Sequence, residues 1–168
     1  MADEEIESLS AISAHDEMAR RIGAHVAGET MSDRELQDTR EFFVQRLEHP
    51  GLEEAGRALE SNNLAAINVI IGDSGLLEEA DRLSRFAYEQ LPIPEVMSTR
   101  GSVLVAMGKY REGLELLQQA LGGLRPDHRD ATNASVAVAQ LHLGDVFAAR
   151  TSMAQMETEP NLPASKEA

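Results

Sequence analysis

A short phrase that recurs three times in the second half of this chain limits what the chain can fold into, because the phrase is typical of the turn between two paired helices. Its clearest copy starts at Gly108 and runs on through Tyr110 and Gly113, and the other two copies start at Gly75 and Gly144. The intervals are 33 and 36 residues. A period of roughly 20 to 50 residues is the signature of a solenoid, whose units stack because none can bury its apolar face alone. The sequence therefore predicts an all-α stack of antiparallel helix pairs.

Apolar periodicity and turn residues predict where the helices lie. Ser32 and Glu35 form a capping-box pattern that starts a helix, and the sequence His49-Pro50-Gly51 ends it. A short helix over residues 52–59 is expected to stop at the polar run 61–63. The three predicted pairs that follow are 63–72 with 76–90, 94–107 with 110–122, and 128–143 with 145–157.

The 168 residues suit one domain with an appended helical segment. Residues 1–60 are expected to form an N-terminal helical extension that caps the array or mediates self-association. Residues 61–158 are expected to form the repeat array, and residues 159–168 a flexible tail.

The chain carries a formal net charge of −14, and most of the excess of acidic over basic side chains falls in the segment 1–60. DNA and RNA are therefore not expected as ligands, since a phosphate-binding surface needs clustered Lys and Arg. A basic partner would be favoured by electrostatic steering. The alternative is that the acidic residues form a solvated face that keeps the protein soluble.

Several absences in the sequence bear on location. There is no cysteine, so neither a disulfide framework nor a thiolate metal site is expected. The N-terminus is acidic, whereas a signal peptide begins with positively charged residues. No apolar run is long enough to cross a bilayer. We expect a cytoplasmic protein, or a soluble piece of a larger one. Thirteen arginines against two lysines fit a GC-rich bacterial genome.

The repeated units resemble tetratricopeptide repeats, helix pairs of about 34 residues that stack into a right-handed superhelix. The resemblance covers about residues 62–160. Its middle unit has small residues such as Gly101 and Gly113 where the family needs them. Such positions let helix axes approach to about 8 Å. The first unit departs from the pattern, with Asn68 at a small position and Ser84 at a bulky one.

The resemblance implies a concave groove, lined by the first helix of each pair, in which the family binds peptides or other proteins. A partner's apolar helix or extended segment would suit this lining, and the chain's own N-terminal helix is one candidate. The implied function is protein binding, as an adaptor or chaperone-like protein. The alternatives are a soluble interaction domain of a larger protein, membrane-bound or not, or a structural homo-oligomer such as a homodimer. The predicted groove residues are Ala65, Val69, Glu95, Ser98, Ser102, Val105, Ala134, Val138 and His142.

No group of residues in the sequence predicts catalysis, a metal site or a cofactor. The segment 72–75 resembles the nucleophile region of trypsin-like proteases, but it reads as a turn in which Asp73 or Ser74 caps a helix. His15 and His25 lack the spacing that brings two histidines to one metal ion. An enzyme is therefore not expected.

Overall fold

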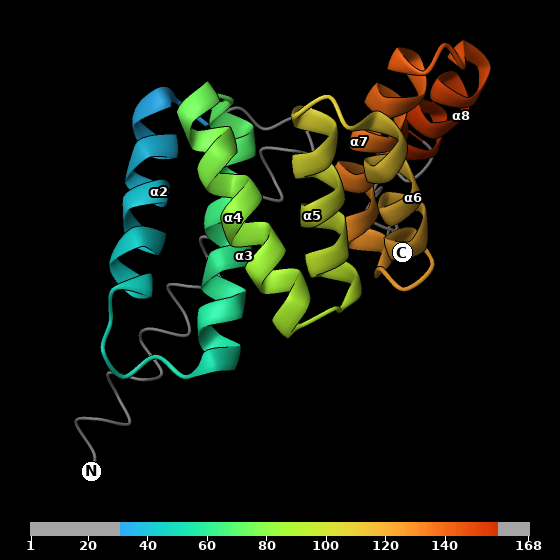
Figure 1. Cartoon of the computed structure of the whole chain (residues 1–168). Coiled ribbons are helices and arrows are strands. Elements are labelled where there is room, and N and C mark those ends of the chain that lie inside the picture. The colour runs from blue at the N-terminus through green and yellow to red at the C-terminus, as the bar shows by residue number, and fades with distance from the viewer. Residues whose placement is uncertain (1–30, 158–168) are drawn as a thin grey trace, which may run out of the picture.

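The computed structural model describes residues 31–157, and all regular structure in this range is helical (Figure 1). The predicted tail and half of the predicted N-terminal extension lie outside the described residues. The elements are α2 (Asp33–Leu47), α3 (Glu54–Ile71), α4 (Ser74–Gln90), α5 (Pro94–Ala106), α6 (Tyr110–Leu121), the 3-10 turn η1 (Pro126–His128), α7 (Arg129–His142) and α8 (Val146–Glu157).

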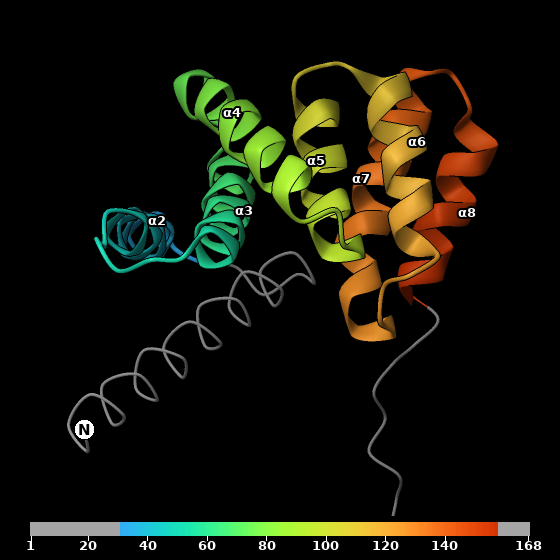
Figure 2. The same ribbon diagram turned by 60° about the horizontal axis from the view of Figure 1, so that its bottom comes forward.

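Each helix packs against the next one along the chain, so that α2 lies at one end of the row and α8 at the other (Figure 1 and Figure 2). The most extensive contacts join α3 to α4, α5 to α6, and α7 to α8. The first helices of these pairs also meet, α3 with α5 and α5 with α7. None of the described helices combines the length and the apolar character needed to cross a membrane.

Three glycines with left-handed backbone end the first helix of each pair. They are Gly72, Gly108 and Gly144, with φ angles of 75°, 81° and 86°, and they recur at intervals of 36 residues. This conformation favours glycine because a Cβ atom would be strained there. The turn of the first pair was predicted at Gly75, which is wrong: Gly75 lies in the first turn of α4, where its N–H donates to the capping Oδ1 of Asp73 at 2.9 Å.

Helix α3 is continuous where the sequence predicted two helices with a break at residues 61–63. Serine and asparagine favour turns, because their side chains compete for backbone hydrogen bonds. Here Ser61 and Asn62 are buried within the helix, and the neighbouring Ala58 and Leu64 are buried too. Tertiary packing therefore overrides the local preference, and the boundary predicted between residues 60 and 61 falls inside α3.

The other predicted helices agree with the structure to within two residues at each end. Helix α2 begins with the predicted capping box: the N–H of Glu35 donates to Ser32 Oγ at 3.3 Å, and Ser32 N–H donates to Glu35 Oε2 at 2.8 Å. Pro94 occupies the first position of α5, where a missing N–H costs no hydrogen bond.

The core consists of three clusters that follow one another along the row of helices, and aliphatic side chains and alanines predominate in it. The buried members are Phe43, Leu64 and Ile67 at the α2 end, Ala65, Ala80 and Val103 in the middle, and Val105, Leu117, Val136 and Ala139 toward α7.

A polar network joins α2, α3 and α4. Asn68 is fully buried; its Oδ1 accepts from Arg40 Nε at 3.0 Å and its Nδ2 donates to Glu79 Oε2 at 2.8 Å. Arg40 also pairs directly with Glu79 at 2.6 Å. Burial alone would raise the pKa of Glu79, but the hydrogen bonds from Arg40 and Asn68 outweigh it, so that the pKa lies below its ordinary value. With the 36-residue spacing of Gly72 and Gly108, Asn68 is equivalent to Leu104, and the small position of the first unit is filled by Ala65, so the predicted departure at Asn68 is wrong.

A second polar contact holds α5 against α4. One nitrogen of Arg100, Nη1, donates to Asp81 Oδ1 at 2.7 Å, to Ser84 Oγ at 3.0 Å and to the Asp81 carbonyl at 3.2 Å. Burial tends to raise the pKa of Asp81, and the hydrogen bond and charge of Arg100 lower it below its ordinary value.

Candidate functional site

A pocket of about 400 Å³ lies between α3, α5 and the segment that runs from the end of α6 into α7. This volume falls within the roughly 300–1,000 Å³ that is typical of ligand sites. Aliphatic residues, hydroxyl and amide side chains, and titratable groups all contribute to it. The lining residues are Asn62, Asn63, Ala66, Val69, Ile70, Glu95, Ser98, Thr99, Ser102, Leu124, Asp127, His128, Asp130, Ala131, Ala134 and Ser135.

Two pairs of hydroxyl groups close the wall between α5 and α7. Ser98 Oγ lies 2.6 Å from Thr132 Oγ1, and Ser102 Oγ lies 2.9 Å from Ser135 Oγ. Small side chains at these places bring the two helices close together, and the hydrogen bonds satisfy polar groups that are partly removed from water. This wall of the pocket is therefore polar, and the two hydrogen bonds fix α5 and α7 relative to each other.

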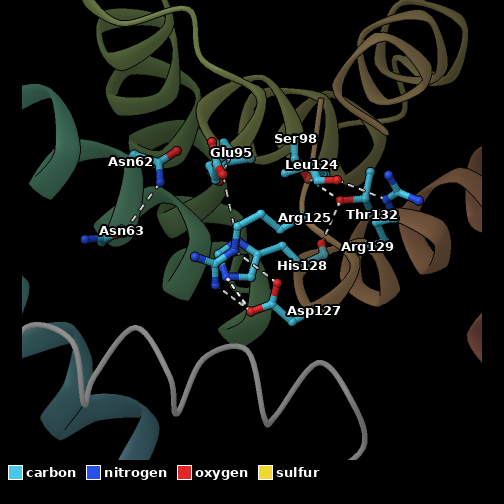
Figure 3. Close-up of polar contacts among 11 residues, drawn as sticks. Asn62, Asn63, Glu95, Ser98, Leu124, Arg125, Asp127, His128, Arg129 and Thr132 are labelled. Atoms are coloured by element: carbon cyan, nitrogen blue, oxygen red, sulfur yellow. Dashed lines mark hydrogen bonds and ion pairs between the residues drawn. The ribbon is translucent and has the colours of Figure 1, made fainter. Parts of the chain in front are cut away.

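Charged groups gather at the rim, where α5 begins and η1 precedes α7 (Figure 3). His128 lies between two carboxylates, with Nδ1 at 3.9 Å from Glu95 Oε1 and Nε2 at 3.7 Å from Asp127 Oδ2. Arg125 donates to both oxygens of Asp127, at 2.6 and 3.2 Å. This hydrogen bonding by Arg125 holds the pKa of Asp127 below its ordinary value.

Asn62 contributes a buried hydrogen-bond acceptor to the pocket. The residue is 9% exposed, and its Nδ2 donates to Asn63 Oδ1 at 3.5 Å (Figure 3). The Oδ1 atom of Asn62 is buried and has no hydrogen-bond partner within the described part of the chain. Leaving a buried acceptor without a donor costs about 1–3 kcal/mol. Asn62, which lines the pocket, therefore carries an unsatisfied polar atom.

Five of the nine predicted groove residues line this pocket, and they come from all three first helices. They are Val69, Glu95, Ser98, Ser102 and Ala134.

The other four predicted groove residues lie elsewhere. Ala65 is fully buried in the middle cluster of the core, and Val105 is 6% exposed because it packs against α7. Val138 and His142 are exposed on α7, outside the pocket, and the imidazole of His142 stacks on the ring of Tyr110 with centroids 4.2 Å apart.

The difference in lining follows from the register of the first unit. A turn at Gly75, 33 residues before Gly108, would make Ala65 the residue equivalent to Ser98. With the observed interval of 36 residues, Asn62 and Ala66 are the residues equivalent to Ser98 and Ser102, and both line the pocket. Equal spacing of Gly72, Gly108 and Gly144 is the signal that would have found them.

The rim residues Asp127 and His128 were also missed by sequence reasoning. They belong to the connection that leads into α7, and connections carry no apolar periodicity. Among residues 31–157, no three His, Cys, Asp or Glu side chains are grouped in a way that could hold a metal ion.

A second surface feature is an apolar face at the α8 end of the row. Its exposed side chains include Phe147, which is 83% exposed, and Leu141, which is 49% exposed. One interval of 36 residues earlier, the residue equivalent to Leu141 is Val105, which α7 covers. The remaining large members of this face are Val138, Leu143, Val146 and Met153.

Comparison with models of protein families finds none that matches this chain. A search of curated proteins finds no matching sequence either.

Proposed function

We propose that this chain is a protein-binding module of the tetratricopeptide type, whose first helices α3, α5 and α7 form a groove that receives a segment of a partner protein. The observation that carries the proposal is the pocket, because the first helix of every pair contributes to its lining. A groove built in this way offers several helix faces to one extended or helical segment.

The helix arrangement supports the proposed repeat type. The left-handed glycines recur at an interval of 36 residues. Tetratricopeptide units have a similar length, about 34 residues. In the middle pair, small residues occur where α5 and α6 touch: a Cβ atom at Gly101 would lie 2.6 Å from Leu117 Cγ. Repeats of this type stack because each pair covers its neighbour's apolar side.

The chemistry of the lining supports a partner that is a protein segment. Ala66, Val69, Ile70 and Leu124 offer apolar contact, while the serine and asparagine side chains offer hydrogen bonds to a backbone. In this proposal the protein acts as an adaptor or a chaperone-like factor in the cytoplasm, or as the interaction domain of a larger protein. It neither binds nucleic acid nor catalyses a reaction.

The proposal is tested by filling the pocket without changing its charge. Ala66→Gln and Ala134→Gln place a longer polar side chain in the groove at positions within helices, where glutamine is well tolerated. The matched control is Ala154→Gln on the exposed side of α8. Capture of partners from cell extract, followed by mass spectrometry, should show a protein that is lost with both pocket variants and kept with the control. Helicity should be equal in all three. If both pocket variants keep every partner, binding occurs on another surface.

A second candidate function is a structural homo-oligomer, and the apolar face at α7 and α8 favours it. Large apolar side chains exposed on two neighbouring helices can mark an interaction site in a soluble protein. Light scattering should then detect a dimer that Phe147→Ser dissociates, whereas Leu59→Ser, at an exposed leucine of α3, leaves it intact. A monomer at every concentration measured would exclude this role.

A further inference from the structure

We infer that the pocket between α3, α5 and α7 is built to hold an arginine side chain of the partner segment, with its guanidinium group between Asn62 Oδ1 and the carboxylate of Glu95. This inference rests on the proposed binding function of the groove and specifies the residue type that the groove recognises.

The unpartnered oxygen of Asn62 is the first observation behind this inference. It is a buried acceptor in the pocket lining, and Figure 3 shows the Asn62 amide with its nitrogen toward Asn63 and its oxygen toward Glu95. A ligand must donate a hydrogen bond to relieve it. An apolar group or an acceptor in the same place would leave the desolvation of this oxygen uncompensated.

The charge of the lining is the second observation. Among residues 31–157, three carboxylates and one histidine line the pocket, but no lysine or arginine does. Arg125 attracts Glu95 electrostatically, yet its hydrogen bonds go to Asp127. The closest ion-pair contact of Glu95 is with the imidazole of His128, at 3.9 Å, and Asp130 forms no ion pair within the described residues. A positively charged group of the partner would therefore balance the negative charge of Glu95 and Asp130 in this pocket.

Helix ends explain only part of this pattern. Glu95 and Asp130 lie in the first turns of α5 and α7, where a carboxylate is stabilised by the partial positive charge of the helix N-terminus. That effect accounts for acidic residues at the rim. It does not account for a buried amide oxygen without a donor, since Asn62 lies within α3.

A guanidinium group fits these acceptors better than an ammonium group. It presents five N–H donors in a rigid plane, so it can bond a carboxylate and an amide oxygen at the same time. The apolar stem of an arginine can lie along Val69, Ile70 and Leu124, which line the same pocket. An ammonium group is more strongly hydrated and directs its donors from a single atom.

The test is a titration of the isotopically labelled protein with N-acetyl-argininamide, followed by NMR. The side-chain amide signals of Asn62 and the backbone signals of the α5 N-terminus should shift in a saturable way. N-acetyl-citrullinamide, which has a similar shape but no charge, should bind at least about tenfold more weakly, because a charge-assisted hydrogen bond is replaced by a neutral one. Equal binding of the two probes, or shifts confined to another face, would overturn the inference.

Substitutions at Glu95 and Asn62 test whether these two residues bind the arginine probe. Glu95→Gln and Asn62→Leu should each weaken N-acetyl-argininamide binding about tenfold. Glu115→Gln, on the exposed side of α6, should leave it unchanged. If Asn62→Leu lowers helicity, the partly exposed Glu95→Gln still decides the question. Unchanged binding in Glu95→Gln would rule out the site.

The two proposals fail separately. If Ala66→Gln and Ala134→Gln lose a partner but the arginine probe does not bind, the groove binds proteins without this arginine subsite. If the probe binds as expected but the same variants keep every partner, the subsite exists and the proposed partner-binding function is wrong.

Discussion

The backbone oxygen of Gly101 lies 2.8 Å from the point that a Cβ atom would occupy on Gly113. Helices α5 and α6 therefore meet backbone to backbone at this place. The same point lies 2.7 Å from a methyl carbon of Val105, so neither side of the contact has space for another atom. Close contact here brings the middle pair together and sets the separation of its two helices.

Gly113→Ala should destabilise the protein by about 1–3 kcal/mol, because the added methyl group must push a backbone aside. The better helix propensity of alanine, about 1 kcal/mol, offsets only part of this cost. Urea unfolding measures the change. Gly122→Ala is the control: it lies at the end of α6, its nearest contact would be 3.4 Å away, and it should cost nothing. Equal stability of both variants would contradict the close contact.

Asn68→Leu should cost about 2 kcal/mol, because hydrogen bonds to charged groups are among the stronger ones inside a protein. The variant loses two of them, one with Arg40 and one with Glu79. Leucine is the residue at the equivalent place in α5, Leu104, so size alone does not forbid the change. A double-mutant cycle with Arg40→Met gives the interaction energy of the network, which should exceed about 0.5 kcal/mol. Simple additivity would mean that Asn68 acts only through packing.

The stability of the protein should depend on pH through Glu79. The pKa of Glu79 in the folded state lies below its ordinary value of 4.5: burial opposes this shift, and the hydrogen bonds of Arg40 and Asn68 produce it. The unfolded chain then binds the proton more readily, so ionised Glu79 stabilises the fold above pH 4.5. This contribution is lost as the pH falls through the folded-state pKa.

Urea unfolding of wild type and Glu79→Gln between pH 7 and pH 3 measures this contribution. The difference in free energy of unfolding should be largest above pH 4.5 and should shrink below it. The exposed neighbour Glu78 supplies the control Glu78→Gln, for which we expect a small difference at every pH. A Glu79→Gln difference that stays constant over the whole range would show that the ion pair with Arg40 is not responsible.

Arg100→Met should cost about 3 kcal/mol, because removing one partner of a buried ion pair leaves the other charge uncompensated. The side chain of Arg100 is only 11% exposed and that of its partner Asp81 is 15% exposed. Arg100→Lys should cost less, about 1 kcal/mol, since one ammonium group can replace a single donor atom. All three hydrogen bonds of Arg100 come from the one atom Nη1. Thermal unfolding followed by circular dichroism should rank the two variants in this order, and the reverse order would mean that the planar shape of arginine is required.

The all-α class and most helix ends could be predicted because local signals determine them. Ser32 and Glu35 cap α2 by contacts within one turn, and Pro94 begins α5 for a reason that involves only its own ring. Likewise Gly108 and Gly144 end their helices through their own backbone angles. Information of this kind is contained in a few adjacent residues.

The continuity of α3 and the pocket could not be predicted, because both depend on contacts between distant residues. Ser61 and Asn62 are buried by tertiary packing, whereas the local sequence contains only the information that both residue types favour turns. The approach of Glu95 to His128 joins the first turn of α5 to the connection that precedes α7. The burial of Val105 likewise depends on how α7 packs against α5, which periodicity does not give.

The three tight glycine turns separate the parts of this chain that must stay constant from those that can change. They link the helices within each pair, whereas Asp127 and His128 lie in the longer connection between two pairs. Residues 125–128, which are exposed, can therefore diverge without changing the turns that define the helix pairs. Related chains that keep the three glycines but differ in the connection between α6 and α7 would have the same architecture and bind other partners.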